Sequence, residues 1–72
     1  MDPCSTLREA RQAAGLTFRE VGQASGLPLT AIAHYERGAR TPGPASLARW
    51  RDGLKQLMAA RAAKIVDVLV RF

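Results

Sequence analysis

Several short stretches of the chain repeat apolar residues at the spacing of an amphipathic helix. The first stretch places four residues on one helical face: Leu7, Ala10, Arg11 and Ala14. Thr6, followed by Glu9, has the form of a capping box, so we expect this helix to begin at Thr6. Gly15 then predicts a left-handed stop, because glycine adopts a positive φ without steric penalty.

A second helix is predicted to begin after Thr17. Glu20 completes a capping box, in which each side chain accepts a hydrogen bond from the backbone N–H of the other residue. Leu16 before the cap and Val21 after it have the spacing of a hydrophobic staple, which fixes the angle of entry into the helix. We expect the helix to end near Ala24, before a Ser-Gly dipeptide.

A third helix is predicted after a short turn that contains glycine. Pro28 suits its first helical position, where a missing N–H costs nothing, and Gly38 ends it. One face is expected to enter the core: Leu27, Ala31, Ile32 and Tyr35. The opposite face carries Leu29, Thr30, Ala33, His34 and Arg37. Gly22, inside the preceding helix, predicts a close approach by another helix, and two short helices joined in this way are typical of a helix-turn-helix.

The remainder of the chain is helical up to an ambiguous end. After a loop stiffened by prolines, a continuous apolar stripe begins at residue 45: Leu47, Trp50, Leu54, Leu57 and Met58. We expect Trp50 in the core, and Gly53 marks a candidate boundary between a fourth and a fifth helix. Residues 65–72 fit both a strand, by the alternation of their valines, and a helix. Their β-branched side chains favour the strand.

Length and cysteine content limit the class of protein. A chain of 72 residues forms one small domain, whose modest core favours support from a second copy. The single Cys4 has no partner for an internal disulfide, which favours a reducing, cytoplasmic location. No apolar run approaches the roughly 20 residues that span a bilayer, so we expect no membrane segment.

Charge points to a polyanionic partner. The chain carries 11 lysines and arginines against 6 acidic residues. Residues 37–64 hold seven of the basic residues and a single acidic residue, Asp52. This balance favours nucleic acid, although a solvated surface has the same composition. One histidine, one cysteine and scattered carboxylates form no nucleophile–base pair and no metal site. We therefore predict no enzyme activity, no cofactor, no metal and no small-molecule ligand.

The segment LREARQAAGLTFREVGQASGLPLTAIAHYERGARTP resembles the Cro/C1-type (XRE, lambda repressor-like) helix-turn-helix family. The ordered features are Arg11 before AAGLT, the Gly26 turn, Ile32, and ERG with Pro42 soon after. The resemblance covers residues 5–57, and we treat residues 58–72 as a separate dimerisation tail. It implies a compact all-α fold of four to five helices that binds double-stranded DNA.

The resemblance also implies roles for individual residues. With the helix of residues 28–37 in the major groove, the base-reading residues are Leu29, Thr30, Ala33, His34 and Arg37. Contacts to phosphate are expected from Thr17, Phe18, Arg19 and Arg40. Arg11 and Glu36 are expected to form a structural ion pair, which agrees with the position of Arg11 on a small, apolar helix face.

This chain departs from the family pattern on its reading face. Phe18 stands where the family often has a glutamine that meets a phosphate, and it has the alternative of folding into the core. Leu29 and Thr30 stand where larger polar residues are common, which removes an amide contact to adenine. Leu29 and Ala33 can instead contact thymine methyl groups, and the alternative for Leu29 is a protein interface. Four further basic side chains are interpreted as solvated: Arg49, Arg51, Lys55 and Arg61.

The tail is too apolar to stay exposed on a monomer. We expect it to pair with a second copy, as strand or helix, through Ile65, Val66, Val68, Leu69, Val70 and Phe72. The sequence thus predicts a homodimeric transcriptional regulator, a repressor of a phage, plasmid or mobile element, that binds a short inverted repeat. The alternative is a protein-interaction module, an antiactivator or antitoxin, that uses the same fold to bind a protein partner.

Overall fold

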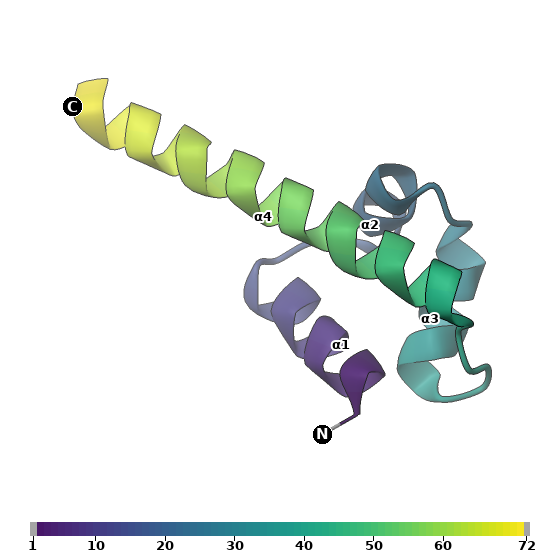
Figure 1. Ribbon diagram of the computed structural model, residues 1–72. Coiled ribbons are helices and arrows are strands. Elements are labelled where there is room, and N and C mark those ends of the chain that lie inside the picture. Colours follow the sequence, from purple (N-terminus) through teal and green to yellow (C-terminus); the bar gives the residue numbers. More distant parts are fainter. Residues whose placement is uncertain (1, 72) are drawn as a thin grey trace.

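The computed structural model describes residues 2–71, and Phe72 of the predicted tail interface lies outside this range. Four helices follow one another along the chain: α1 (Pro3–Ala13), α2 (Phe18–Ser25), α3 (Leu29–Arg37) and α4 (Pro44–Arg71). The first three helices and the start of α4 form the body, from which the rest of α4 projects (Figure 1). Helices make up all the regular structure of residues 2–71, which confirms the all-α fold.

Helix α1 begins four residues earlier than the sequence predicts, with its N-cap at Asp2 instead of Thr6. The Asp2 carboxylate accepts a hydrogen bond of 3.1 Å from the Cys4 N–H, and Pro3 takes the first helical position. Thr6, the predicted cap, lies inside the helix, where its hydroxyl donates to the Asp2 carbonyl over 3.3 Å. An acidic cap followed by proline is the stronger start signal, so it overrides the capping-box pattern at Thr6. Gly15 has the predicted positive φ, of 67°.

Helix α2 begins directly after Thr17, as expected, and it ends at Ser25, one residue after the expected Ala24. The Thr17 hydroxyl accepts from the Glu20 N–H and the Glu20 carboxylate accepts from the Thr17 N–H, both over 3.1 Å. The capping box is therefore confirmed. The close approach predicted at Gly22 is made by the turn and the first residue of α3, because a Cβ there would lie 2.8 Å from the Leu27 carbonyl oxygen and 3.3 Å from the Leu29 nitrogen.

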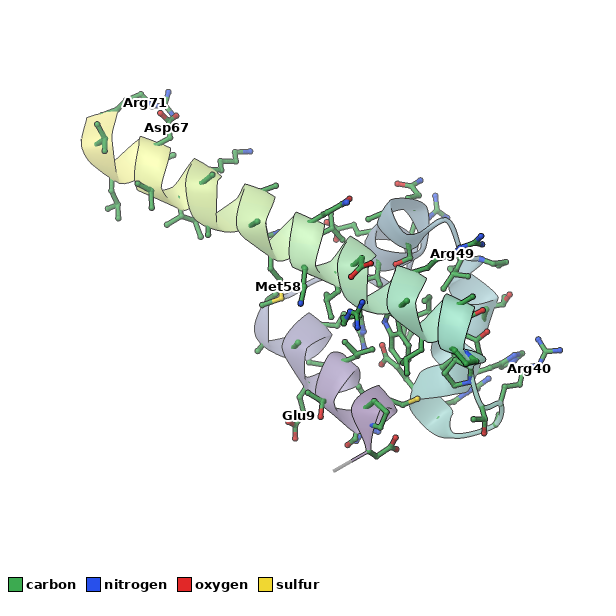
Figure 2. The ribbon with its side chains drawn as sticks, in the orientation of Figure 1. Glu9, Arg40, Arg49, Met58, Asp67 and Arg71 are labelled. Carbon is green, nitrogen blue, oxygen red and sulfur yellow. The ribbon has the colours of Figure 1, made fainter. Side chains whose placement is uncertain are left out.

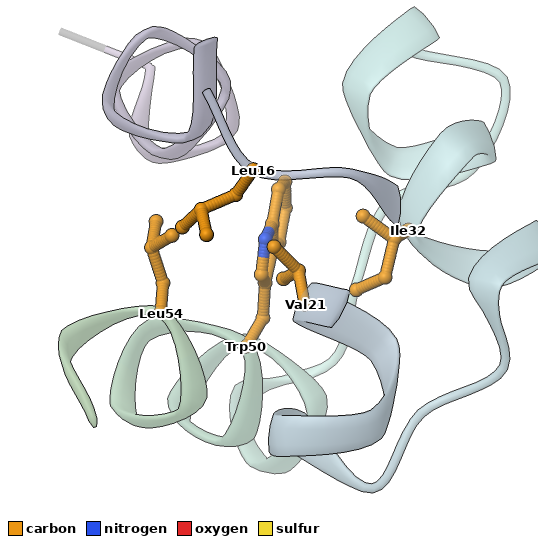
Figure 3. Packing of buried hydrophobic residues seen from close by; sticks show 5 residues of the cluster. All are labelled: Leu16, Val21, Ile32, Trp50 and Leu54. Carbon is orange, nitrogen blue, oxygen red and sulfur yellow. The ribbon is translucent and has the colours of Figure 1, made fainter. Parts of the chain in front are cut away.

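Five apolar side chains make the fully buried core: Leu16, Val21, Ile32, Trp50 and Leu54. Trp50 rises from α4 between Leu16 and Leu54 on one side and Val21 and Ile32 on the other (Figure 3). Each fully buried side chain of this size stabilises the fold by about 1.5–3 kcal/mol. Trp50 thus has the predicted core position, and it joins α4 to the segments that carry α2 and α3.

Helix α4 runs unbroken through Gly53, so the candidate boundary at Gly53 is wrong and the lower of the two expected helix numbers holds for residues 2–71. A Cβ at Gly53 would lie 2.7 Å from the Ser25 backbone nitrogen and would also overlap its side chain. Glycine at this position allows the end of α2 to pack directly on α4. Glycine in a helix interior costs about 1 kcal/mol relative to alanine. The packing of α2 on α4 outweighs this cost, so Gly53 does not break the helix.

The tail is helical through Arg71, so the strand that its valines favoured is wrong. A helix already formed by residues 44–57 is extended at little cost, whereas a strand needs a neighbour for its backbone groups. Its apolar side chains are solvent-exposed: Ile65, Val66, Val68, Leu69 and Val70. Asp67 and Arg71 form an ion pair of 3.3 Å along the helix. Among the described helices, none combines the length and apolarity needed to cross a membrane.

Candidate nucleic-acid interface

A tight turn sets α3 against α2. Gly26 ends α2 with a φ of 69°, and the Leu27 N–H donates back to the Gly22 carbonyl over 3.0 Å. Pro28 is extended, with ψ of 143°, and is the N-cap residue of α3. The sequence predicts it at the first helical position, so α3 begins one residue later than expected, at Leu29. Its ring offers no side-chain acceptor, so the first N–H groups of α3 have no side-chain cap. Gly38 ends the helix with a φ of 75°.

The predicted base-reading residues share one face of α3, which we call the reading face: Leu29, Thr30, Ala33, His34 and Arg37. Leu29 is 42% exposed, Thr30 and Arg37 are also exposed, and the remaining two are half-buried. The opposite face of α3 is anchored in the body by Ile32 and Glu36, both buried. The structure therefore brings these five side chains together on a surface that the core does not use.

The start of α2 lies against this motif with mixed exposure. Arg19 is exposed, as a phosphate contact requires. Thr17 is also exposed, but its N–H and its hydroxyl both donate to the Glu20 carboxylate, over 3.1 and 3.2 Å. Phe18 is half-buried and packs on the core, and the Arg11 guanidinium lies 4.3 Å from the centre of its ring. The Phe18 side chain thus follows the alternative in which it folds inward. Only its backbone N–H, at the first position of α2, suits a phosphate.

A buried ion pair holds α3 to α1. Arg11 donates to both carboxylate oxygens of Glu36, over 2.7 and 2.9 Å, and to the Leu16 carbonyl over 2.8 Å. The side chains are 13% and 4% exposed. This is the pair that the sequence predicts, and every group has a charged or polar partner. Burying such a pair is tolerated only when the geometry satisfies both ions, so it fixes the orientation of α3.

Basic side chains continue beyond α3. Arg40, in the loop after the helix, is exposed and extends into solvent at the end of the molecule opposite Asp67 and Arg71 (Figure 2). Arg49 on α4 is also exposed. Exposed arginines beside a helix-turn-helix are suited to phosphate, which they contact without reading sequence.

A hollow of about 490 Å³ lies along the turn between α2 and α3. Its lining comes from both helices and the turn: Arg19, Gly22, Gln23, Gly26, Leu27, Pro28 and Leu29. Leu29 therefore borders both the reading face and this hollow.

One contact that sequence reasoning missed involves Arg61, which was interpreted as solvated. Its guanidinium donates to the Ala14 carbonyl over 2.9 Å and to the Glu20 carboxylate over 3.0 Å. The pKa of Glu20 is held below its usual range, mainly by the Thr17 N–H, and the Thr17 hydroxyl and Arg61 lower it further. Desolvation raises this pKa, an effect second in size to that of the Thr17 N–H. Arg61 is 41 residues from Glu20 in sequence, so no local pattern could indicate the pair.

The comparison with protein families decides the class. A family described as a helix-turn-helix domain matches residues 5–63, most of the chain. The chain belongs to this helix-turn-helix domain family. The match confirms the family resemblance drawn from the sequence and identifies DNA as the partner of this class of domain. No curated protein and no solved structure gives a significant match.

Proposed function

We propose that this helix-turn-helix protein is a sequence-specific transcriptional regulator. It binds a short inverted repeat as a homodimer with α3 in the major groove, and it represses genes of a phage, plasmid or other mobile element. The observation that supports this most is the reading face, which is free of core contacts while the buried Arg11–Glu36 pair anchors the opposite side of α3. A rigid helix with one free face is what base reading requires.

The chemistry of the reading face defines what it would read. Leu29 and Ala33 present methyl groups that match the methyl of thymine. Thr30 donates or accepts a hydrogen bond, and His34 reaches a purine acceptor or a phosphate. Arg37, near the end of the helix, can bond two acceptors of guanine. The reading face therefore favours operator half-sites that are rich in thymine at their centre.

The phosphate contacts would come from both ends of the motif. Thr17, the Phe18 N–H and Arg19 approach one phosphate strand, and Arg40 approaches the other side of the groove. The net charge of +5 adds an attraction that is independent of sequence and weakens as salt rises. Phosphates orient the protein, and the reading face then selects the bases.

Dimerisation would use the tail. Leu69 and Val70 are 69% and 79% exposed, and the neighbouring Ile65, Val66 and Val68 are at least 48% exposed. A strip of large aliphatic side chains on a projecting helix is costly to leave in water, so a second tail is its natural cover. Two copies related by a twofold axis would present two reading faces to the two halves of an inverted repeat.

The test is selection of duplexes from a random pool, followed by affinity measurements at increasing salt. We expect enrichment of an inverted repeat and a salt-dependent affinity for it. Thr30→Ala and Arg37→Ala should each relax selection at one position of each half-site, by about 1–3 kcal/mol. Lys55→Gln, which removes a charge from an exposed position of α4 outside the tail, serves as the control. Weak binding that enriches no sequence would contradict the proposal.

A second candidate function has a specific observation in its favour. The hollow beside Leu29 and the apolar reading face also suit a protein partner, as in an antiactivator or antitoxin. In that case Leu29→Ala would abolish capture of the partner, and the duplex pool would yield no repeat. The same selection experiment therefore separates the two candidates.

A further inference from the structure

Arg61 lies where α4 leaves the body of the protein. The last side chain of α4 that packs on the core is Leu57, and from Met58 onward every described residue of the helix is exposed. Arg61 reaches back from this exposed segment to Ala14 and Glu20, over 2.9 and 3.0 Å. Within residues 2–71, these are the hydrogen bonds that side chains of α4 make to the other helices and their caps.

The two acceptors belong to the ends of two different helices. Ala14 caps the C-terminus of α1, where the exposed carbonyl groups attract a cation. Glu20 lies in the first turn of α2, and its other oxygen already accepts from the Thr17 N–H and hydroxyl, over 3.1 and 3.2 Å. One guanidinium thus connects α1, α2 and α4, with its second acceptor held in place by the capping box.

Apolar packing contributes little at the same place. A hollow of about 290 Å³ lies between the end of α1 and α4 next to the guanidinium, lined by Ala13, Ala14, Met58, Arg61, Ala62 and Ile65. Met58 is 40% exposed beside it. Beyond Leu57, the two hydrogen bonds of Arg61 are the described side-chain hydrogen bonds between α4 and the ends of α1 and α2, and the side chains of Arg61 and Glu20 are 45% and 37% exposed.

We propose that Arg61 is a positioning residue that fixes the angle between the tail and the reading face, and so sets the half-site spacing that the dimer accepts. The inference rests on the proposed dimeric DNA binding. Trp50 and Arg61 are 11 residues apart, or about 16 Å along the helix. A bend of roughly 12° at Arg61 would move the body at Trp50, and the reading face with it, by about 3.4 Å, the rise of one base pair. A small loss of angular control therefore erases a preference for one spacing.

The experiment measures binding to two selected half-sites separated by spacers of increasing length. We expect the unmodified protein to lose about tenfold in affinity for each base pair added or removed. Arg61→Gln removes the positive charge and the paired N–H donors of the guanidinium. The affinity of this variant should therefore vary by no more than about threefold over the same spacers. Arg61→Lys keeps one contact and should lie between the two. Affinity for a single half-site should stay the same in all three proteins.

Two further variants separate positioning from general effects. Lys55→Gln removes a positive charge from an exposed position of the same helix outside the tail, and it should keep the spacing profile of the unmodified protein. Glu20→Gln retains a residue that supports the capping box but weakens the pair with Arg61, so it should broaden the profile as Arg61→Gln does. If Arg61→Gln fails to fold, the spacing profile of Glu20→Gln tests the proposal in its place.

The outcomes distinguish this inference from the proposed function. If the unmodified protein selects no inverted repeat, the proposed function fails and the role of Arg61 fails with it. If it selects one spacing and both Arg61→Gln and Glu20→Gln select the same spacing as sharply, only the role of Arg61 is overturned.

Discussion

Arg11 on α1 and Glu36 on α3 form a buried ion pair with two hydrogen bonds, of 2.7 and 2.9 Å, on the buried side of α3. The pair lies behind the surface that would meet DNA. It therefore acts on function only through the position of α3, and its loss is first a loss of stability.

Removing one partner of this pair should destabilise the fold strongly. Glu36→Gln leaves the Arg11 charge buried without a counter-ion, and we expect the free energy of unfolding to fall by about 3–5 kcal/mol. Denaturant titration followed by circular dichroism measures this. Asp52→Asn breaks the exposed pair with Arg51, of 3.1 Å, and should cost less than about 1 kcal/mol. Equal losses in the two variants would contradict the structural role of the buried pair.

Gly53→Ala should destabilise the protein although alanine is the better helix former. The new methyl group would lie 2.7 and 2.8 Å from the Ser25 backbone nitrogen and Cα, which cannot move without shifting α2. We expect a net loss of about 1–3 kcal/mol, larger than the gain of about 1 kcal/mol in helix propensity. Asp52→Ala, at the exposed neighbouring position, should change stability by less than about 0.5 kcal/mol. A more stable Gly53→Ala variant would show that α2 and α4 are packed less closely.

Acid should weaken the junction around Glu20. Its folded pKa is lowered from 4.5, chiefly by the Thr17 N–H, so the carboxylate binds protons less readily in the folded state than in the unfolded state. The resulting stabilisation is complete above the unfolded pKa and is lost as the pH falls below it and through the folded value. Thermal unfolding between pH 3 and 7 should show a steeper acid decline for the unmodified protein than for Glu20→Gln. Parallel pH curves would contradict this.

Arg40 should contribute affinity without specificity. Because it is exposed in the loop after α3 and has no base-reading position, Arg40→Gln should weaken binding to all duplexes alike. The slope of log affinity against log salt should fall by about 1, the share of one phosphate contact. Lys55→Gln, at an exposed position of α4 outside the tail, should leave both quantities unchanged. A changed sequence preference for Arg40→Gln would instead assign Arg40 to base reading.

The sequence was informative where a signal is local and unopposed. The capping box at Thr17 and the stop at Gly38 need only residues a few positions away, and both have the predicted form. Trp50 could be placed in the core because it lies within a clear helical stripe. The Arg11–Glu36 pair spans 25 residues, and it was reached through the family pattern together with the cost of an unpaired buried arginine.

The sequence misled where two local signals compete or where the reason lies in a distant segment. Both Asp2 and Thr6 are good helix caps, and the proline after Asp2 decides between them. Gly53 has the form of a boundary, but its reason is the contact with Ser25 on another helix. Arg61 is indistinguishable in sequence from a solvated arginine, because its acceptors are assembled only by the fold.

The tail offers a test of dimerisation that leaves the body intact. Leu69 is 69% exposed and makes no core contact, so Leu69→Glu should not change unfolding of the body. It introduces a charge into the proposed interface, and we expect a monomer by sedimentation equilibrium because a buried unpaired carboxylate is strongly disfavoured. Ala60→Glu adds the same charge to the opposite face of α4 and should remain dimeric. If Leu69→Glu stays a dimer as stable as Ala60→Glu, the second copy binds through another surface.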